Sequence, residues 1–126
     1  MLPFSIDLKP GFPISEQVVF AVKKAVIKGQ LLPGASFPSV RILSEELKIN
    51  RNTAHKVIAD LVQEGVLITT PAVGSIIAKR ETGGSGNRVE LLSADLERLA
   101  VEARKLGLSL SEIQVSLADQ WKRLGK

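Results

Sequence analysis

Apolar residues recur every three or four positions in three stretches of the first eighty residues, which is the spacing of helices that bury one face. We expect these helices at 15–28, 40–47 and 51–64. Ser39 and Asn50 stand directly before the second and third helices, and both residue types are preferred N-caps. Only a few residues separate these two helices, and the third presents polar and basic groups near its start. This pattern predicts a helix-turn-helix.

Two short runs rich in β-branched residues follow the third helix, at 66–70 and 75–78, and Pro71-Ala72-Val73-Gly74 separates them. Strand-like runs around a Pro/Gly turn are typical of a β-hairpin. A hairpin behind a helix-turn-helix is interpreted as a wing, whose tip stays exposed. We therefore predict a mainly α fold with a small β-hairpin, in which residues 1–80 form a winged helix-turn-helix domain.

Residues 81–88 contain three glycines and a serine, and we interpret them as a linker, or alternatively as a loop inside one domain. Two amphipathic helices are predicted across 89–126, and Ser109 and Glu112 form a capping box before the second. A pair of about forty residues is too small to bury its own apolar stripes, so we expect an αα-hairpin that serves as a dimerisation domain. Trp121 is interpreted as the anchor of a core or of the dimer interface. The expected interface residues share the apolar stripes of the two helices: Leu92, Leu96, Leu99, Ala103, Leu106, Ile113, Leu117 and Trp121.

The composition argues against several classes of protein. The chain has no cysteine, which rules out disulfides, thiolate nucleophiles and Cys-ligated zinc. His55 is the only histidine, and no motif around it completes a metal or catalytic site, so we expect no metal, no cofactor and no enzymatic activity. The N-terminus does not have the pattern of a signal peptide, and no apolar run approaches the ~20 residues that span a bilayer. We therefore expect a cytoplasmic protein without a membrane partner.

The net charge of +4 lies entirely in the first eighty residues. Ten Lys and Arg residues stand there against six Asp and Glu residues, whereas 81–126 hold seven of each kind. A modest basic excess fits a polyanionic partner such as nucleic acid, but many soluble domains share it. The charge alone is therefore weak support for DNA binding.

One combination of residues is specific. Pro33-Gly34 is followed by Phe37-Pro38-Ser39-Val40-Arg41, then by Asn50-Arg51-Asn52-Thr53, and Glu64-Gly65-Val66-Leu67 leads into the hairpin. With this combination, residues 13–78 resemble the DNA-binding domain of the GntR family of bacterial regulators. The short helical tail, with Gly-Leu-Ser between its helices, resembles the YtrA-like subfamily. The resemblance implies a homodimeric regulator of double-stranded operator DNA, typically a repressor, and often one of operons that encode membrane transporters.

Side-chain chemistry and the resemblance together single out DNA-binding residues. Arg51 is the candidate for reading guanine, because a guanidinium can donate to both acceptors of that base, and Asn52 could pair with adenine by similar logic. Thr53 and Lys56 suit phosphate, which positions the protein without reading sequence. The expected set lies on the second and third helices and at the wing: Ser39, Arg41, Asn50, Arg51, Asn52, Thr53, His55, Lys56, Gly74 and Ser75.

Several of these residues also have an ordinary structural interpretation. Ser39 could cap its helix and do nothing more. Arg41 could form a surface ion pair with Glu45, although the resemblance implies a DNA contact. His55 contacts DNA or lies idle on the surface, and Gly74 approaches the minor groove or only shapes the turn. Without the resemblance, the set on the third helix would be an ordinary solvated helix face.

The sequence departs from the family at three positions. Ala72 replaces the first glycine of the usual Gly-x-Gly wing, Pro71 stands where a basic residue is frequent, and His55 stands where another branch often has arginine. These departures affect the expected strength of the contact between the wing and DNA and the expected base preference. The main alternative function is a protein-interaction adaptor that uses the winged helix as a scaffold. The sequence does not identify a small-molecule effector.

Overall fold

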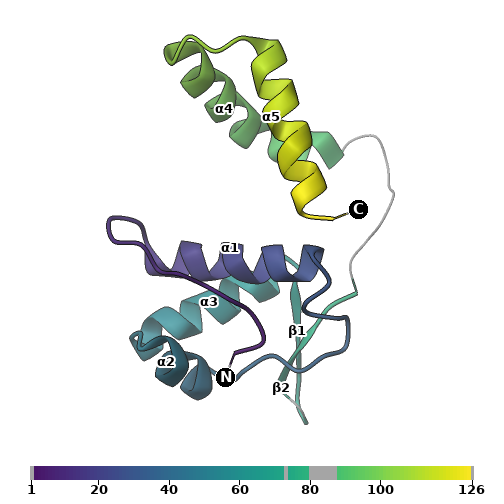
Figure 1. Ribbon diagram of the computed structural model, residues 1–126. Helices are drawn as coiled ribbons and strands as arrows, with labels where there is room; N and C mark the ends of the chain where they lie inside the picture. The colour runs from purple at the N-terminus through teal and green to yellow at the C-terminus, as the bar shows by residue number, and fades with distance from the viewer. Residues whose placement is uncertain (1, 73, 80–87, 126) are drawn as a thin grey trace. The chain divides into compact units, whose positions relative to one another are not determined.

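The computed structural model describes residues 2–72, 74–79 and 88–125, and the chain divides into two compact units, Met1–Arg80 and Glu81–Lys126 (Figure 1). Within these residues, five α-helices, a short 3-10 helix and one antiparallel hairpin confirm the predicted fold class. Except for Arg88, the predicted linker at 81–88 lies outside the described residues. None of the helices described is long and apolar enough to span a membrane.

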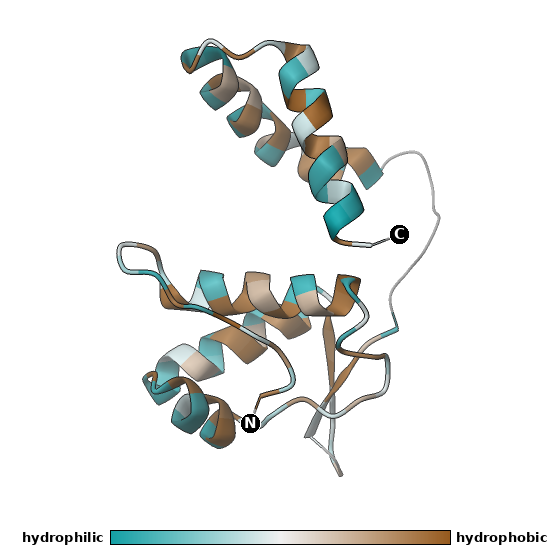
Figure 2. Cartoon of the chain, viewed as in Figure 1, coloured by the Kyte–Doolittle hydropathy of each residue, from teal (hydrophilic) through white to brown (hydrophobic). Residues whose placement is uncertain are grey.

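The helices of the first unit lie within one residue of their predicted positions. α1 is Ile14–Ile27, α2 is Val40–Leu47 and α3 is Arg51–Gln63. Both α1 and α2 pack against α3, and Figure 2 shows that each helix contains both hydrophobic and hydrophilic residues. Val62 of α3 is 38% exposed, so it lies outside the buried face formed by Ala54, Val57 and Leu61.

Both predicted N-caps of the helix-turn-helix are present. The Ser39 hydroxyl oxygen accepts a hydrogen bond from the Ile42 N–H at 3.3 Å, and the Asn50 side-chain oxygen accepts one from the Asn52 N–H at 2.7 Å. These bonds satisfy N–H groups that a helix leaves unpaired in its first turn. Between the helices, Lys48 has a left-handed backbone with φ 57° and ψ 47°. The caps and this left-handed residue define where α2 ends and α3 begins.

The hairpin consists of β1, Leu67–Thr70, and β2, Gly74–Ile77, which pair antiparallel. The structure adds a segment at 34–37 in which Ser36 forms an antiparallel bridge to Ile76 of β2, and the sequence did not predict it. Its backbone hydrogen bonds run from the Gly34 N–H to the Ile77 oxygen (2.8 Å), from the Ile77 N–H to the Ala35 oxygen (2.9 Å) and from the Phe37 N–H to the Ser75 oxygen (2.9 Å). The wing is thereby tied to the segment that leads directly into α2.

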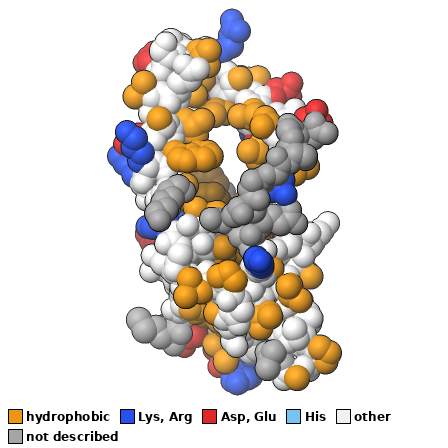
Figure 3. All heavy atoms as spheres, turned by 90° about the vertical axis from the view of Figure 1, so that its right-hand side faces the viewer, with side chains coloured by type: hydrophobic (Ala, Val, Ile, Leu, Met, Phe, Trp, Pro, Cys, Tyr) orange, Lys and Arg blue, Asp and Glu red, His pale blue; other side chains and the backbone are white. Residues whose placement is uncertain are grey.

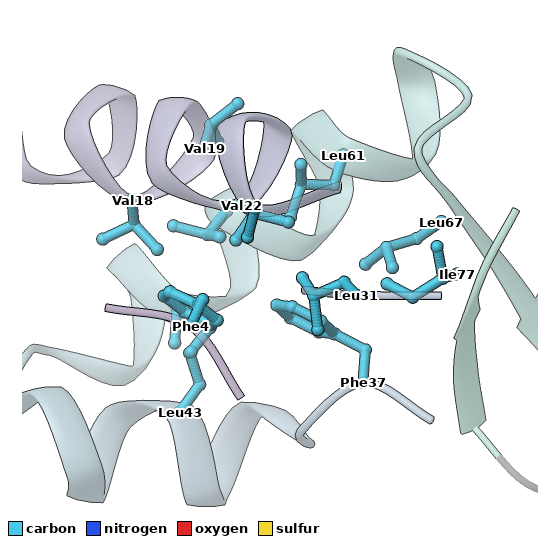
Figure 4. Close-up of a cluster of buried hydrophobic side chains, with 13 residues drawn as sticks. Phe4, Val18, Val19, Val22, Leu31, Phe37, Leu43, Leu61, Leu67 and Ile77 are labelled. Atoms are coloured by element: carbon cyan, nitrogen blue, oxygen red, sulfur yellow. The ribbon is translucent and has the colours of Figure 1, made fainter. Parts of the chain in front are cut away.

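The core of the first unit lies between the three helices and the hairpin (Figure 4). Its buried apolar residues are Phe4, Val18, Val19, Val22, Ala25, Leu31, Phe37, Leu43, Ala54, Val57, Leu61, Leu67 and Ile77. Phe4 comes from the N-terminal segment and stacks on Phe37, with ring centroids 6.0 Å apart. The side chain of Gln17 in α1 also holds this segment, because it accepts from the Lys9 N–H at 2.8 Å and donates to the Lys9 oxygen at 2.9 Å. The N-terminal segment is therefore part of the folded unit.

The second unit begins with η1, Arg88–Leu92, a 3-10 helix that was not predicted, followed by α4, Ser93–Lys105, and α5, Leu110–Arg123. The predicted capping box is present. The Glu112 carboxylate accepts from the Ser109 N–H at 2.9 Å, and the Ser109 hydroxyl oxygen accepts from the Glu112 N–H at 3.2 Å. Hydrogen bonding from the Ser109 backbone, and then from its side chain, lowers the pKa of Glu112 below its ordinary value.

The second unit by itself buries few of its apolar side chains. Among its described residues Ala103 alone is buried, while Ile113 and Leu124 are half-buried. The exposed residues of the predicted stripes are Leu92, Leu96, Leu99, Leu106, Leu117 and Trp121. Figure 3 shows hydrophobic side chains on the surface of this unit. Two helices with such open apolar faces lack the core that a small unit needs to be stable alone.

Candidate nucleic-acid interface

α3 buries one face and exposes a polar one. Its buried residues are Ala54, Val57 and Leu61, which pack in the core. Its exposed residues are Arg51, Asn52, His55, Lys56, Ala59 and Gln63, together with the apolar Val62 near its end. Within the described part of the chain, the side chains of Arg51 and Asn52 have neither a hydrogen-bond nor an ion-pair partner. Both stand in the first turn of α3 with their polar groups available to a ligand.

The start of each helix in the helix-turn-helix offers N–H groups to an anion. At α2 the Ser39 oxygen is used as a cap, which leaves the hydroxyl proton to donate elsewhere. At α3 the Asn50 oxygen is used as a cap, so its amide nitrogen is the group left for a ligand. Thr53 is only half-exposed. Two of these predicted site residues therefore cap a helix, and the third is partly buried in the first turn of α3. A phosphate contact would add to these structural roles.

Two predicted cations are already paired. Arg41 Nη1 lies 3.3 Å from Glu45 Oε1, and Lys56 Nζ lies 3.2 Å from Asp60 Oδ2. All four side chains are at least partly exposed, so these pairs contribute little to folding stability. The pair of Arg41 with Glu45 was expected as one alternative, whereas the pair of Lys56 with Asp60 was not expected. The pair of Lys56 with Asp60 could have been predicted from the sequence, because residues four apart on a helix are neighbours.

At the wing, Gly74 is exposed and has a left-handed backbone with φ +76°. An added Cβ there would meet no atom within 4 Å, so backbone conformation and not crowding favours glycine. The Thr70 hydroxyl donates to the Gly74 oxygen at 2.8 Å and braces the tip. Ser75 is half-buried, and its carbonyl accepts from the 34–37 segment. Val73 lies outside the described residues.

The predicted interface residues of the second unit divide into two groups. Ala103 and Ile113 lose exposure within the chain itself. The other six keep open apolar surface, from 43% exposed at Leu99 to 70% at Leu106, and Trp121 is 67% exposed. Trp121 is therefore no core anchor of a single chain. Among the residues that the structure describes, no cluster of three His, Cys, Asp or Glu side chains is arranged to hold a metal ion.

Comparison with known proteins gives matches to both units. The model of the gntR family of bacterial regulatory proteins matches residues 14–77. The HTH-type transcriptional repressor YtrA of Bacillus subtilis (strain 168) is 29% identical over 109 residues, 86% of this chain and 84% of that protein. A transcriptional antiterminator from Listeria monocytogenes EGD-e has a TM-score of 0.79 at 30% identity, covering 94% of this chain and 89% of that one. AraR(DBD) in complex with operator ORX1 has a TM-score of 0.52 at 26% identity, over 58% of this chain and 93% of that one.

Proposed function

The chain belongs to the GntR family of bacterial regulatory proteins and is a DNA-binding transcriptional regulator, and we propose that it acts as a homodimeric repressor on an inverted-repeat operator. The observation that carries this proposal is the exposed polar face of α3, held at a tight turn behind α2. In helix-turn-helix proteins such a face enters the major groove. The similarity to a repressor and to a protein solved with its operator supports the same function.

Arg51 and Asn52 are the proposed base readers. Both are exposed in the first turn of α3, where the recognition helix of a helix-turn-helix contacts base edges. Arg51 would donate to guanine in bidentate fashion, and Asn52 would pair with adenine. His55 lies one turn further along the same exposed face, where it would contact DNA beside them. These residues supply the sequence preference of the regulator.

The remaining site residues are proposed to bind phosphate. Ser39 and Asn50 can each donate a hydrogen bond while they cap a helix, and Thr53 is a half-exposed residue whose hydroxyl can donate as well. Arg41 and Lys56 supply positive charge close to the same helices. Gly74 and Ser75 place the wing, whose exposed glycine would allow the backbone to approach the minor groove. Because the 34–37 segment joins the wing to the start of α2, both contacts would be set in one rigid piece.

The second unit is the proposed dimerisation domain. Six of its eight predicted interface residues keep open apolar surface in the single chain, and water contact with such surface is unfavourable. A second copy of the same hairpin would cover it, and a two-fold axis is the usual arrangement of such a pair. The axis would present two recognition helices to half-sites about one helical turn apart, ~34 Å along the duplex.

Binding to a random duplex at increasing salt concentration tests the DNA-binding part of the proposal. Sequence-independent binding is electrostatic, so the account predicts a Kd of about 10⁻⁴ to 10⁻⁶ M at physiological salt and a steep loss of affinity as salt rises. A winged-helix adaptor that recruits only protein need show neither behaviour. No salt-dependent binding, even at low salt, would overturn the proposed function in favour of the adaptor.

A further inference from the structure

The two ion pairs of the helix-turn-helix share the same order along the chain. In each pair the cation comes first and the acid four residues later: Arg41 then Glu45 in α2, and Lys56 then Asp60 in α3. On an isolated helix the opposite order, with the acid first, is the more stabilising. Both acids also lie in the last turn of their helix, where the macrodipole disfavours negative charge. Both pairs therefore have the order and position that stabilise a helix less.

The second unit shows the contrasting arrangement. In α5 Asp119 precedes Arg123, with Oδ2 and Nη2 2.9 Å apart, and the cation stands in the last turn of the helix. This order and position suit both the side-chain pair and the dipole. The side chains of Asp119 and Arg123 are about as exposed as those of Arg41 and Glu45, whereas Asp60 is less exposed, so Asp119–Arg123 is matched in exposure to the pair of α2.

The acids of the helix-turn-helix also reduce its charge. Residues 40–63 hold four basic and three acidic residues, so the two helices that would meet a polyanion carry almost no net charge. We propose that Glu45 and Asp60 hold Arg41 and Lys56 off the DNA phosphates and thereby lower the affinity of this regulator for DNA of any sequence. This inference rests on the proposed function, because it assigns a role to two residues beside the proposed phosphate contacts.

The contacts predict how strong each effect is. A carboxylate within 3.3 Å of a cation competes for the charge that a phosphate would otherwise bind. The Asp60 side chain is 31% exposed and the Glu45 side chain 62%, so Asp60 is held more firmly and is the stronger competitor. Each cation released to a phosphate adds up to about 0.9 to the salt slope of binding. Removal of one acid should therefore tighten binding to random DNA about 3- to 10-fold at low salt, with less effect at high salt.

Affinity for a random 20-base-pair duplex, measured by fluorescence anisotropy across a salt series, tests the inference with the full-length chain. Asp60→Asn and Glu45→Gln keep the side-chain shapes and remove one negative charge each. Asp119→Asn removes the same charge from the matched pair in α5. The expected result is tighter binding and a steeper salt slope for the first two variants, larger for Asp60→Asn, and less than about a two-fold change for the third. The inference would be overturned if Asp60→Asn and Asp119→Asn change the affinity for the duplex equally, or if neither changes it.

A second comparison tests whether Asp60 acts through Lys56. In a chain that already carries Lys56→Ala, the further change Asp60→Asn should tighten binding less than two-fold. If it tightens binding as much as in the native chain, Asp60 repels phosphate directly and the proposed competition is wrong. Failure of the proposed function itself has a different signature, because the native chain would then show no salt-dependent binding to the duplex.

Discussion

Replacement of Lys48 by glycine should stabilise the first unit. Among the described residues Lys48 is the only non-glycine residue with a positive φ, and its N–H donates to the Ser44 oxygen at the end of α2. A left-handed backbone costs an L-residue about 1–2 kcal/mol, and glycine avoids that cost. Glycine also loses about 0.5–1 kcal/mol more conformational entropy on folding. The difference predicts that Lys48→Gly raises the free energy of unfolding by about 0.5–1 kcal/mol.

Native-state hydrogen exchange at a core amide of α3, such as that of Leu61, measures this change in the full-length chain. A gain of that size slows exchange by global unfolding by a factor of about 2 to 5. Lys28→Gly is the matched control, since Lys28 caps α1 with a right-handed backbone at φ −78°. There the same substitution should speed exchange. If Lys48→Gly also speeds exchange, the left-handed turn is not strained and the reasoning is refuted.

Three further predictions concern DNA reading, assembly and pH. Arg51→Ala should weaken binding to a selected duplex by about 1–3 kcal/mol and relax the base preference at one position per half-site, whereas Lys56→Ala should weaken binding to all sequences alike. If Arg51→Ala weakens binding to selected and random duplexes equally, Arg51 does not read a base. Leu99→Asp puts a charge on the proposed interface and should reduce the mass measured by light scattering to that of one chain. Val101→Asp, on the opposite face of α4, should leave the mass unchanged, and an unchanged mass for Leu99→Asp would refute the proposed interface. Because folding lowers the pKa of Glu112, the ionised side chain stabilises α5 at pH values above its ordinary pKa of 4.5. This stability is lost as the pH falls through the lower pKa of the folded state. The NMR shift of its hydrogen-bonded partner amide should therefore titrate with a midpoint below 4.5, and Glu112→Gln should abolish the titration; a midpoint at or above 4.5 would contradict the capping geometry.

The helices were predictable because their signals are local. Apolar spacing, the N-caps Ser39 and Asn50 and the capping box at Ser109 each involve residues within one or two helical turns. The bridged segment at 34–37 was not predictable, because it is too short to show a strand pattern and pairs with β2 about forty residues further on. The pairing of this segment with β2 is determined by tertiary packing, and the pattern of residues within the segment gives no information about it.

The candidate site was predictable in residue identity and less so in contacts. Side-chain chemistry and the resemblance together singled out Arg51 and Asn52, and the structure adds that both are exposed and unpaired within its described part. The left-handed turn residue could not be located from the sequence, because Lys48 occupies it in place of the glycine that usually marks such a position. The stack of Phe4 on Phe37 was likewise beyond reach, since it joins residues more than thirty positions apart.

Selection of binding sites from a random DNA library tests the central claim most directly. A homodimeric regulator with two recognition helices should enrich an inverted repeat whose half-site centres lie about one helical turn apart. The same selection with Arg51→Ala should lose preference at one position in each half-site, because the proposed guanine contact is removed. Enrichment of no sequence, or of single sites without a repeat at any spacing, would contradict the account of this chain as a dimeric, sequence-specific regulator.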